Sequence, residues 1–227
     1  MISLKDKNAL ITGSSRGIGQ QIAIGLAKQG CNIIVHGRTS ESCSETLSLL
    51  KKYDVKIYCV PGEPSEESKV NQLIKDVKQL EISVDILYNN AAIMTPFHEN
   101  IWKHSWDEWM DTFKVNVFAM YRLCGAFIPN MIENDFGRII NTTSGIKDQP
   151  ELAPYGASKW AVRKLTEDIA VKLENTGVRI NMLDPGWLMT DMGGQNAEHP
   201  VEAVLPGALS PALIDNNGPN GAFFSAI

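Results

Sequence analysis

The stretch from residue 7 to residue 36 constrains the fold of this chain more than any other. Residues 7–12 form a short apolar run, residues 13–19 read Gly-Ser-Ser-Arg-Gly-Ile-Gly, and residues 18–29 carry apolar side chains at helical spacing until Gly30 stops the pattern. Residues 32–36 form a second short apolar run. A strand, a glycine turn, a helix and a strand in this order predict a βαβ unit, and therefore an α/β fold with a parallel sheet.

The glycine turn is of a kind that binds the pyrophosphate of a dinucleotide. Glycines let the backbone approach the phosphates, and the start of the following helix offers unpaired N–H groups and a positive dipole. The spacing runs Gly-x-x-x-Gly-x-Gly through Gly13, Gly17 and Gly19. As a bare pattern it also occurs in tight turns without a ligand. Its place at a junction from strand to helix favours dinucleotide binding.

The end of the second apolar run indicates which dinucleotide is bound. Enzymes that use NAD place an acidic residue there to hold the ribose 2′-hydroxyl. This chain reads His-Gly-Arg-Thr over residues 36–39 and has no carboxylate before Glu41. Arg38, together with Arg16 of the glycine turn, can hold a 2′-phosphate, although two solvated arginines would give the same pattern. The sequence predicts NADP(H) in preference to NAD(H).

Tyr155 and Lys159 are four residues apart, so on a helix they lie side by side. An ammonium beside a phenol stabilises the phenolate and lowers the pKa of the tyrosine from about 10 towards working pH. Ser144, after the apolar run 137–143, can present its hydroxyl to the same point. The three residues suit the donation of a proton to a carbonyl oxygen, although an exposed Tyr–Lys pair on a helix is a common alternative.

Length and charge limit the other functions. The 227 residues fit one domain, residues 1–227, and the net charge of −5 disfavours a nucleic-acid partner. Charges at residues 5–7 argue against a signal peptide, and no stretch of about 18 apolar residues suggests a membrane span. The four cysteines and four histidines show no metal-ligand spacing, so we expect no metal. A cytoplasmic protein is predicted.

The rest of the chain continues the alternation of strands and helices. Further strands are expected at residues 55–60, 82–88, 137–143, 178–183 and 222–226. Helices are expected at residues 40–53, up to about 80, up to about 131, 154–175 and 201–214. Trp102, Trp106, Trp109 and Phe113 have near-helical spacing and are interpreted as core residues. Asn116 lies inside a helix, where an asparagine is mildly unfavourable unless its amide makes hydrogen bonds.

Taken together, these features resemble the short-chain dehydrogenase/reductase family. The family marks occur in order: residues 12–19, the Asn-Asn-Ala-Ala loop at 89–92, Asn116, Ser144, the pair Tyr155 and Lys159, and Pro-Gly at 185–186 with Thr190. The resemblance runs through essentially the whole chain. It implies a single Rossmann domain, a doubly wound parallel sheet of about seven strands with helices on both faces.

The resemblance also implies roles for individual residues. Tyr155 would be the catalytic acid/base, Ser144 would hold the substrate oxygen, and Lys159 would bond the nicotinamide ribose and depress the pKa of Tyr155. Asn116 would kink its helix and anchor a water that relays protons to Lys159. The residues that would contact the cofactor are Gly13, Ser15, Arg16, Gly17, Ile18, Gly19, Arg38, Thr39, Glu63, Asn90, Ala91, Tyr155, Lys159, Pro185, Gly186, Leu188 and Thr190. The segments 185–194 and 218–223 are similar to those of NADPH carbonyl reductases within the family.

Three departures from the family pattern bear on the site. Ser144 precedes Tyr155 by only 11 positions, so the loop between them is tighter, and Thr143 is an alternative for the serine role. Glu63 stands where the family commonly has an aspartate that contacts adenine, and Pro64 removes a backbone N–H there. Ala92 replaces a glycine and adds a methyl group near the cofactor.

The predicted activity is hydride transfer between NADP(H) and a small carbonyl or secondary alcohol, with no nucleic acid or membrane involved. The alternative is a regulatory protein that binds NADP(H) without turnover. The family forms homodimers and homotetramers, and its carbonyl-reductase-like members are often monomers, so the sequence leaves the assembly open.

Overall fold

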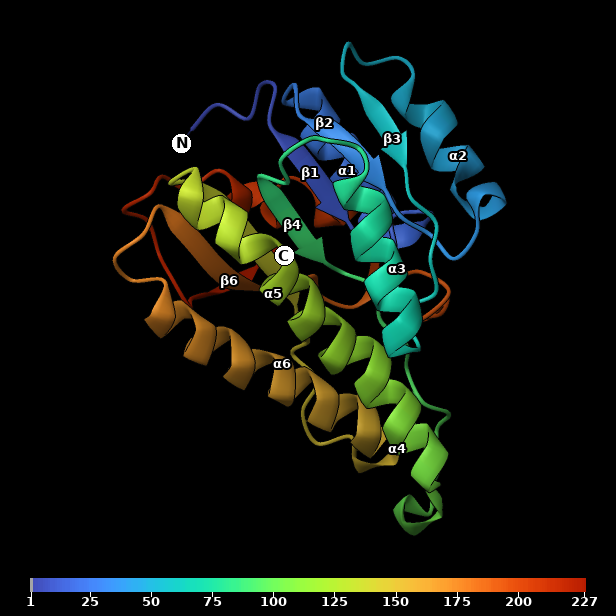
Figure 1. Cartoon of the computed structure of the whole chain (residues 1–227). Coiled ribbons are helices and arrows are strands. Elements are labelled where there is room, and N and C mark those ends of the chain that lie inside the picture. Colours follow the sequence, from blue (N-terminus) through green and yellow to red (C-terminus); the bar gives the residue numbers. More distant parts are fainter. Residues whose placement is uncertain (1) are drawn as a thin grey trace.

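Seven strands form one parallel sheet in a computed structural model that describes residues 2–227 (Figure 1). They are β1 (Asn8–Ile11), β2 (Asn32–Val35), β3 (Ile57–Cys59), β4 (Ile86–Asn89), β5 (Gly137–Thr142), β6 (Val178–Asp184) and β9 (Phe223–Ser225). Their order across the sheet is β3-β2-β1-β4-β5-β6-β9, and every neighbouring pair is parallel. The predicted seven-stranded, doubly wound sheet is confirmed.

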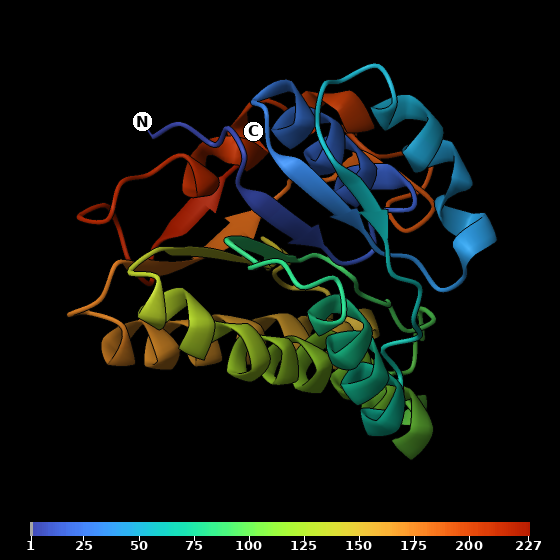
Figure 2. The ribbon, with the colours of Figure 1, turned by 45° about the horizontal axis from the view of Figure 1, so that its top comes forward.

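Helices cover both faces of the sheet (Figure 2). One face carries α1 (Gly17–Lys28) and α2 (Ser40–Leu50), and the other carries α3 (Glu67–Lys78), α5 (Met120–Glu133) and α6 (Ala153–Lys172). Neighbouring strand residues alternate between the two cores: Leu10 packs with the second group of helices and Ile11 with the first. Because both faces are buried, the strands read as continuous apolar runs, and this made them recognisable in the sequence.

The C-terminal segment differs from the prediction. In place of one helix over residues 201–214 there are two 3₁₀ helices, η4 (Val201–Val204) and η5 (Gly207–Ala212). Pro206 and Pro211 have no N–H to donate, so an α-helical ladder cannot run through them. Both pieces still pack against the face that carries α1. A small pair of strands, β7 (Leu188–Met189) and β8 (His199–Pro200), precedes them and was not predicted.

One long helical stretch runs from α4 (Trp106–Phe113) through the π-helical η2 (Lys114–Ala119) into α5. By length and composition alone this 28-residue stretch is apolar enough to cross a membrane, a weak indication that buried core helices also give. Half of its most apolar window is buried inside the fold. The interpretation of Trp102 and Trp106 as core residues is wrong: they are 88% and 77% exposed.

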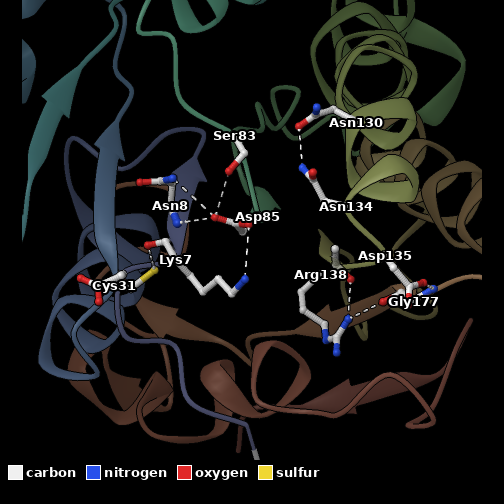
Figure 3. Close-up of polar contacts among 12 residues, drawn as sticks. Lys7, Asn8, Cys31, Ser83, Asp85, Asn130, Asn134, Asp135, Arg138 and Gly177 are labelled. Atoms are coloured by element: carbon white, nitrogen blue, oxygen red, sulfur yellow. Dashed lines mark hydrogen bonds and ion pairs between the residues drawn. The ribbon is translucent and has the colours of Figure 1, made fainter.

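Polar contacts with two separate centres lie at the amino ends of the strands (Figure 3). At the first centre, one carboxylate oxygen of Asp85 accepts hydrogen bonds from the Asn8 backbone at 2.9 Å and from Ser83, while the other pairs with Lys7 at 3.6 Å. Asp85 is 8% exposed. These contacts join the starts of β1 and β4.

Arg138 on β5 is the second centre, and it is fully buried. Its Nη1 donates to the carbonyl oxygens of Gly137 and Gly177, its Nε to that of Ile214, and its Nη2 to the Asn216 side chain, all within 2.9 Å. Burial is the main reason that the pKa of Arg138 falls to about 10. One guanidinium thus joins β5, the turn before β6 and the segment after η5.

Candidate active site

The site lies at the carboxyl ends of the strands, around a cavity of about 1120 Å³. Its wall includes the glycine turn, the end of β2, the loop after β4, the segment 142–159 and residues 184–193. Residues as far apart in the chain as Gly13 and Val201 therefore face one space. Its volume exceeds the roughly 300–1,000 Å³ of a typical small-molecule pocket, which leaves room for a dinucleotide and a second molecule.

The glycine turn faces this cavity with unpaired backbone groups. Gly13 and Gly17 have φ values of +65° and +59°, which favour glycine. Arg16 precedes α1 without a side-chain cap, and the first turn of α1 has no acidic residue. The free N–H groups at the start of α1 therefore remain available to an anion. Ser15, Arg16 and Ile18 line the cavity beside them.

Gly19 was predicted to contact the cofactor, but in the structure it serves the packing of α1. It does not line the cavity, and a Cβ at this position would lie 2.4 Å from the Gly13 carbonyl oxygen. Its lack of a side chain lets α1 pack closely on the turn, so Gly19 supports the phosphate cradle without being part of its surface.

Two residues outside the predicted set of cofactor contacts, Thr12 and His36, hold the turn in place. The Thr12 hydroxyl accepts the backbone N–H groups of Asn90 and Ala91, each at 3.0 Å. His36 Nδ1 accepts the Gly13 N–H at 3.0 Å, and burial lowers the pKa of His36 to about 4. A neutral histidine is needed to accept this bond. A buried histidine at the end of a strand was the only sequence signal for it.

The end of β2 brings some of the predicted residues to the cavity and excludes others. Arg38 is exposed and lines the cavity, together with Glu63 and Pro64 from the loop after β3. Thr39 does not line it, because its hydroxyl accepts the Ser42 N–H at 3.2 Å and caps α2. Asn90 and Ala91, from the loop after β4, also line the cavity, beside the glycine turn.

Ser144, Tyr155 and Lys159 meet in the wall of the same cavity. The Ser144 hydroxyl accepts the Ile146 N–H at 3.2 Å and lies near enough to Tyr155 to lower the pKa of its phenol. The Lys159 ammonium lies 5.6 Å from the centre of the Tyr155 ring and donates to the Thr142 carbonyl oxygen at 2.8 Å. Thr143, the alternative to Ser144, donates its hydroxyl to the Leu183 carbonyl oxygen instead. The shorter loop therefore leaves Ser144 as the hydroxyl beside Tyr155.

The charges around Tyr155 differ from the expectation. In the polypeptide alone, desolvation raises the pKa of Tyr155 above its usual value, the Ser144 hydroxyl lowers it, and the charge of Asp184 raises it. Burial lowers the pKa of Lys159 to about 8, and Asp184 opposes that shift. The predicted lowering of the Tyr155 pKa is therefore wrong for the polypeptide alone, because desolvation outweighs the neighbouring ammonium.

Asp184, at the end of β6, is a site residue that the sequence reading missed. It lines the cavity, and a Cβ on Gly145 would lie 2.6 Å from its carboxylate, so the loop after β5 passes directly over it. The carboxylate also accepts the Gly186 N–H at 3.0 Å. An acidic residue directly before Pro-Gly was the available signal.

Asn116 lies in the π-helical stretch η2, behind the cavity wall and not on it. Its amide exchanges two hydrogen bonds of 2.9 Å with the Ile93 backbone and donates a third to Ser158, whose hydroxyl bonds the Tyr155 carbonyl oxygen. Asn116 therefore connects the loop after β4 to the helix that carries Tyr155. A helix-interior asparagine with a used amide is what the sequence suggested.

Residues 185–193 form the remaining wall. Pro185, Gly186, Leu188 and Thr190 all line the cavity, and Leu188 is buried. Thr190 accepts the Gly193 N–H at 3.0 Å, which closes a tight turn. Asp191 pairs with Arg16 of the glycine turn at 2.8 Å across the mouth, with both side chains mostly exposed.

The residues present fit a pyridine dinucleotide. The free N–H groups of α1 suit its phosphates, and Arg38 suits a further phosphate. The Tyr155 hydroxyl, with Lys159 and Ser144 beside it, suits the protonation of a substrate oxygen next to the reacting ring. A bound pyridine nucleotide would supply a hydride or accept one.

Comparison with known proteins agrees with this reading. Residues 7–200 match the family model described as short chain dehydrogenase. The chain is 36% identical over 200 residues to L-rhamnose 1-dehydrogenase (NADP(+)) of Thermoplasma acidophilum, covering 86% of this chain and 78% of that protein. It is 31% identical over 196 residues to 5-keto-D-gluconate 5-reductase of Escherichia coli, covering 85% and 76%.

A solved structure is similar over nearly the whole chain. The landomycin C-6 ketoreductase LanV, with bound NADP and rabelomycin, superposes with a TM-score of 0.86 at 25% identity, covering 99% of this chain and 96% of that one. The similarity to the carbonyl-reductase subgroup stays a prediction. On the match to the family model and on these relatives, the chain belongs to the short-chain dehydrogenase family.

Proposed function

We propose that this chain, acting as a single domain, transfers a hydride between NADP(H) and the carbonyl or secondary-alcohol carbon of a small molecule, with Tyr155 as the acid/base. One observation carries the proposal: Tyr155, Ser144 and Lys159 line the same cavity as the free N–H groups of the glycine turn. A proton donor and a dinucleotide cradle in one cavity are what carbonyl reduction requires.

Each residue of the group has a distinct task. Tyr155 gives its hydroxyl proton to the substrate oxygen during reduction and recovers it during alcohol oxidation. Ser144, which lines the same cavity beside Tyr155, presents a second hydroxyl to the same oxygen and fixes its position. Lys159 is buried and bonded to Thr142, so its ammonium stays beside the tyrosine and favours the phenolate. Asn116 positions the helix through Ser158.

The preference for NADP(H) rests on Arg38. It is the cationic side chain at the end of β2 that lines the cavity, and Glu41, the nearest acid, does not line it. Arg16 also lines the cavity, but it already pairs with Asp191. The NADP named for L-rhamnose 1-dehydrogenase and bound in the ketoreductase structure supports the same choice.

The test is oxidation of NADPH by the purified chain with a carbonyl panel, with NADH in parallel. The carbonyl panel begins with keto sugar acids, and the reverse reaction, reduction of NADP⁺, is run with aldoses, after the classes named in the two relatives. Tyr155→Phe removes only the hydroxyl, and we expect turnover to fall by about 10²–10⁴-fold while NADPH binding, followed by its fluorescence, persists. Tyr121→Phe, which removes the hydroxyl of an exposed tyrosine, is the matched control.

Two results would contradict the proposal in different ways. Turnover that survives in Tyr155→Phe would remove the tyrosine from the acid/base role. Tight NADPH binding with no reduction of any carbonyl in a broad panel would instead favour the regulatory protein that binds without turnover.

A further inference from the structure

A cluster of two histidines and a glutamate lies outside the proposed active site. His98 comes from the loop after β4, and His104 and Glu108 flank the start of α4. One ligand atom from each residue lies within 4.8 Å of the others. His98 Nε2 is 2.8 Å from one Glu108 oxygen, and His104 Nδ1 is 3.7 Å from the other.

The His104 ring has one nitrogen with no partner. Its Nε2 lies 3.0 Å from the Glu151 carbonyl oxygen, which only accepts, so Nε2 carries the hydrogen. This leaves Nδ1 with a lone pair, buried and without a hydrogen bond, on a side chain that is 2% exposed. If Nδ1 were protonated as well, 3.7 Å to Glu108 would still be too long for a hydrogen bond. A buried nitrogen that faces a carboxylate without a hydrogen bond needs a partner between them, and a cation can be that partner.

A purely structural reading explains only part of the cluster. Glu108 and Ser105 form a capping box at the start of α4, in which the Ser105 N–H donates to Glu108 at 2.7 Å. His98 adds one more donor to the same carboxylate. Neither contact uses His104 Nδ1, and helix capping does not require a buried histidine.

We propose that His98, His104 and Glu108 bind a divalent transition-metal ion, with a water in the fourth position. Two imidazole nitrogens and one carboxylate oxygen are a ligand set that suits Zn²⁺ and neighbouring first-row metals. Metal–ligand bonds of about 2.0–2.1 Å place tetrahedral ligand atoms about 3.3 Å apart. The two histidine nitrogens lie 2.8 and 3.7 Å from different Glu108 oxygens, and one ligand atom from each residue lies within 4.8 Å of the others, so the cluster would contract around the ion.

The surroundings of the cluster have the pattern expected around metal ligands. The Glu151 carbonyl oxygen accepts both the His104 Nε2–H and the backbone N–H of His98, and Ser105 bonds the carboxylate. Such second bonds fix the orientation of ligating rings and carboxylates. Five residues separate His98 from His104, and three separate His104 from Glu108. The segment between them contains a loop and a short 3₁₀ helix, η1 (Ile101–Lys103), so the sequence spacing did not reveal this cluster.

The metal would join two parts of the chain. Glu151 lies in the 3₁₀ helix η3 (Pro150–Leu152), directly before the helix that carries Tyr155. Gln149 and Leu152, on either side of Glu151, line the large cavity. A bound ion would therefore hold the segment 98–108 against the entrance of α6.

The experiment is titration of the metal-free full-length chain with Co²⁺ and Zn²⁺, read by the visible absorption of bound Co²⁺ and by calorimetry. We expect one ion per chain and a tetrahedral Co²⁺ spectrum without the charge-transfer band of a cobalt–thiolate bond. Zn²⁺ should also raise the melting temperature, because it binds the folded chain.

Glu108→Gln is the decisive variant, because glutamine keeps the capping hydrogen bond but removes the charged ligand. We expect it, and His104→Gln, to weaken Co²⁺ binding by more than about tenfold. His199→Gln is the matched control, since His199 is an exposed histidine 4.0 Å from a carboxylate, that of Glu198, and belongs to no such cluster among residues 2–227.

Two outcomes would overturn the proposal. One is a wild-type chain that binds neither ion. The other is a folded Glu108→Gln chain, checked by circular dichroism, that binds Co²⁺ as tightly as the wild type.

Discussion

The two ends of the sheet use buried charge in opposite ways. At the amino end every guanidinium nitrogen of Arg138 donates a hydrogen bond, and both carboxylate oxygens of Asp85 have partners. At the carboxyl end Lys159, which can donate three hydrogen bonds, makes one to a described residue. The charges at the amino end stabilise the fold, whereas the charge at the carboxyl end has hydrogen-bond donors left for a ligand.

The largest effect is expected from Arg138→Met. This change leaves several carbonyl oxygens without a donor in a buried place, so we expect the free energy of unfolding to fall by about 3–5 kcal/mol. Turnover per folded molecule should stay within about twofold. Urea unfolding and active-site-normalised kinetics measure both, with Arg163→Met, at an exposed ion pair, as the control. If Arg138→Met lost turnover but kept its stability, Arg138 would serve the reaction and not the stability of the fold.

Lys159→Met should have the opposite profile, with turnover lost and a pH-dependent effect on stability. The pKa of Lys159 is about 8 in the folded chain and 10.5 in its ordinary state. As the pH rises, the folded chain therefore releases this proton before the unfolded chain does. The free-energy cost of burying the ammonium is fully present below pH 8, and it is relieved as the pH rises towards 10.5. Relative to Lys159→Met, the wild type should gain up to about 3 kcal/mol of stability over that range.

The measurement is unfolding by urea at a series of pH values between 7 and 10. Lys164→Met, at an exposed lysine of the same helix that pairs with Asp168, serves as the control and should show no such trend. If the difference in the free energy of unfolding between the wild type and Lys159→Met did not change with pH, burial of the ammonium would not destabilise the folded chain.

Arg38→Ser sharpens the comparison at a single ligand contact. Loss of one charge-assisted hydrogen bond should raise the KM for NADPH by about tenfold and leave the KM for NADH unchanged, which is the internal control. Stability should not change, because Arg38 is exposed. An equal effect on both cofactors would separate Arg38 from the 2′-phosphate.

The smallest effect is expected from Asp191→Asn, which breaks the ion pair with Arg16 across the mouth of the cavity. Exposed pairs contribute at most about 1 kcal/mol, so the melting temperature and kcat/KM should change little. A kcat/KM change of more than about fivefold would show that this pair controls access to the site.

The sheet and the location of the site were predictable, and the reasons are physical. Buried parallel strands appear as short apolar runs, and their carboxyl ends gather at one edge, so Arg38, Asn90, Ser144 and Pro185 had to approach one another. Two features were not predictable in this way: the π-helical stretch around Asn116, and the two 3₁₀ helices that replace the single helix predicted for residues 201–214. Both depend on local competition for backbone hydrogen bonds, which the periodicity of apolar residues does not show.

Roles that depend on packing could not be read from the sequence. Gly19 and Thr39 occupy expected positions, but one supports the turn and the other caps a helix. Asp184 becomes a neighbour of Tyr155 only when β6 lies beside β5. The pKa of Tyr155 depends on how far water is excluded, a property of the assembled cavity. Cytoplasmic location and the homodimer or homotetramer remain predictions.

The Asn116 amide has a practical consequence for redesign of the pocket. Because it holds the Ile93 backbone on one side and reaches the Tyr155 carbonyl through Ser158 on the other, a library that varies residues 92–94 for a new substrate also perturbs the alignment of the phenol. Variants selected there for affinity alone should turn over slowly. Diversity placed at Met189 and Met192, which line the same cavity but take no part in these hydrogen bonds, escapes that penalty.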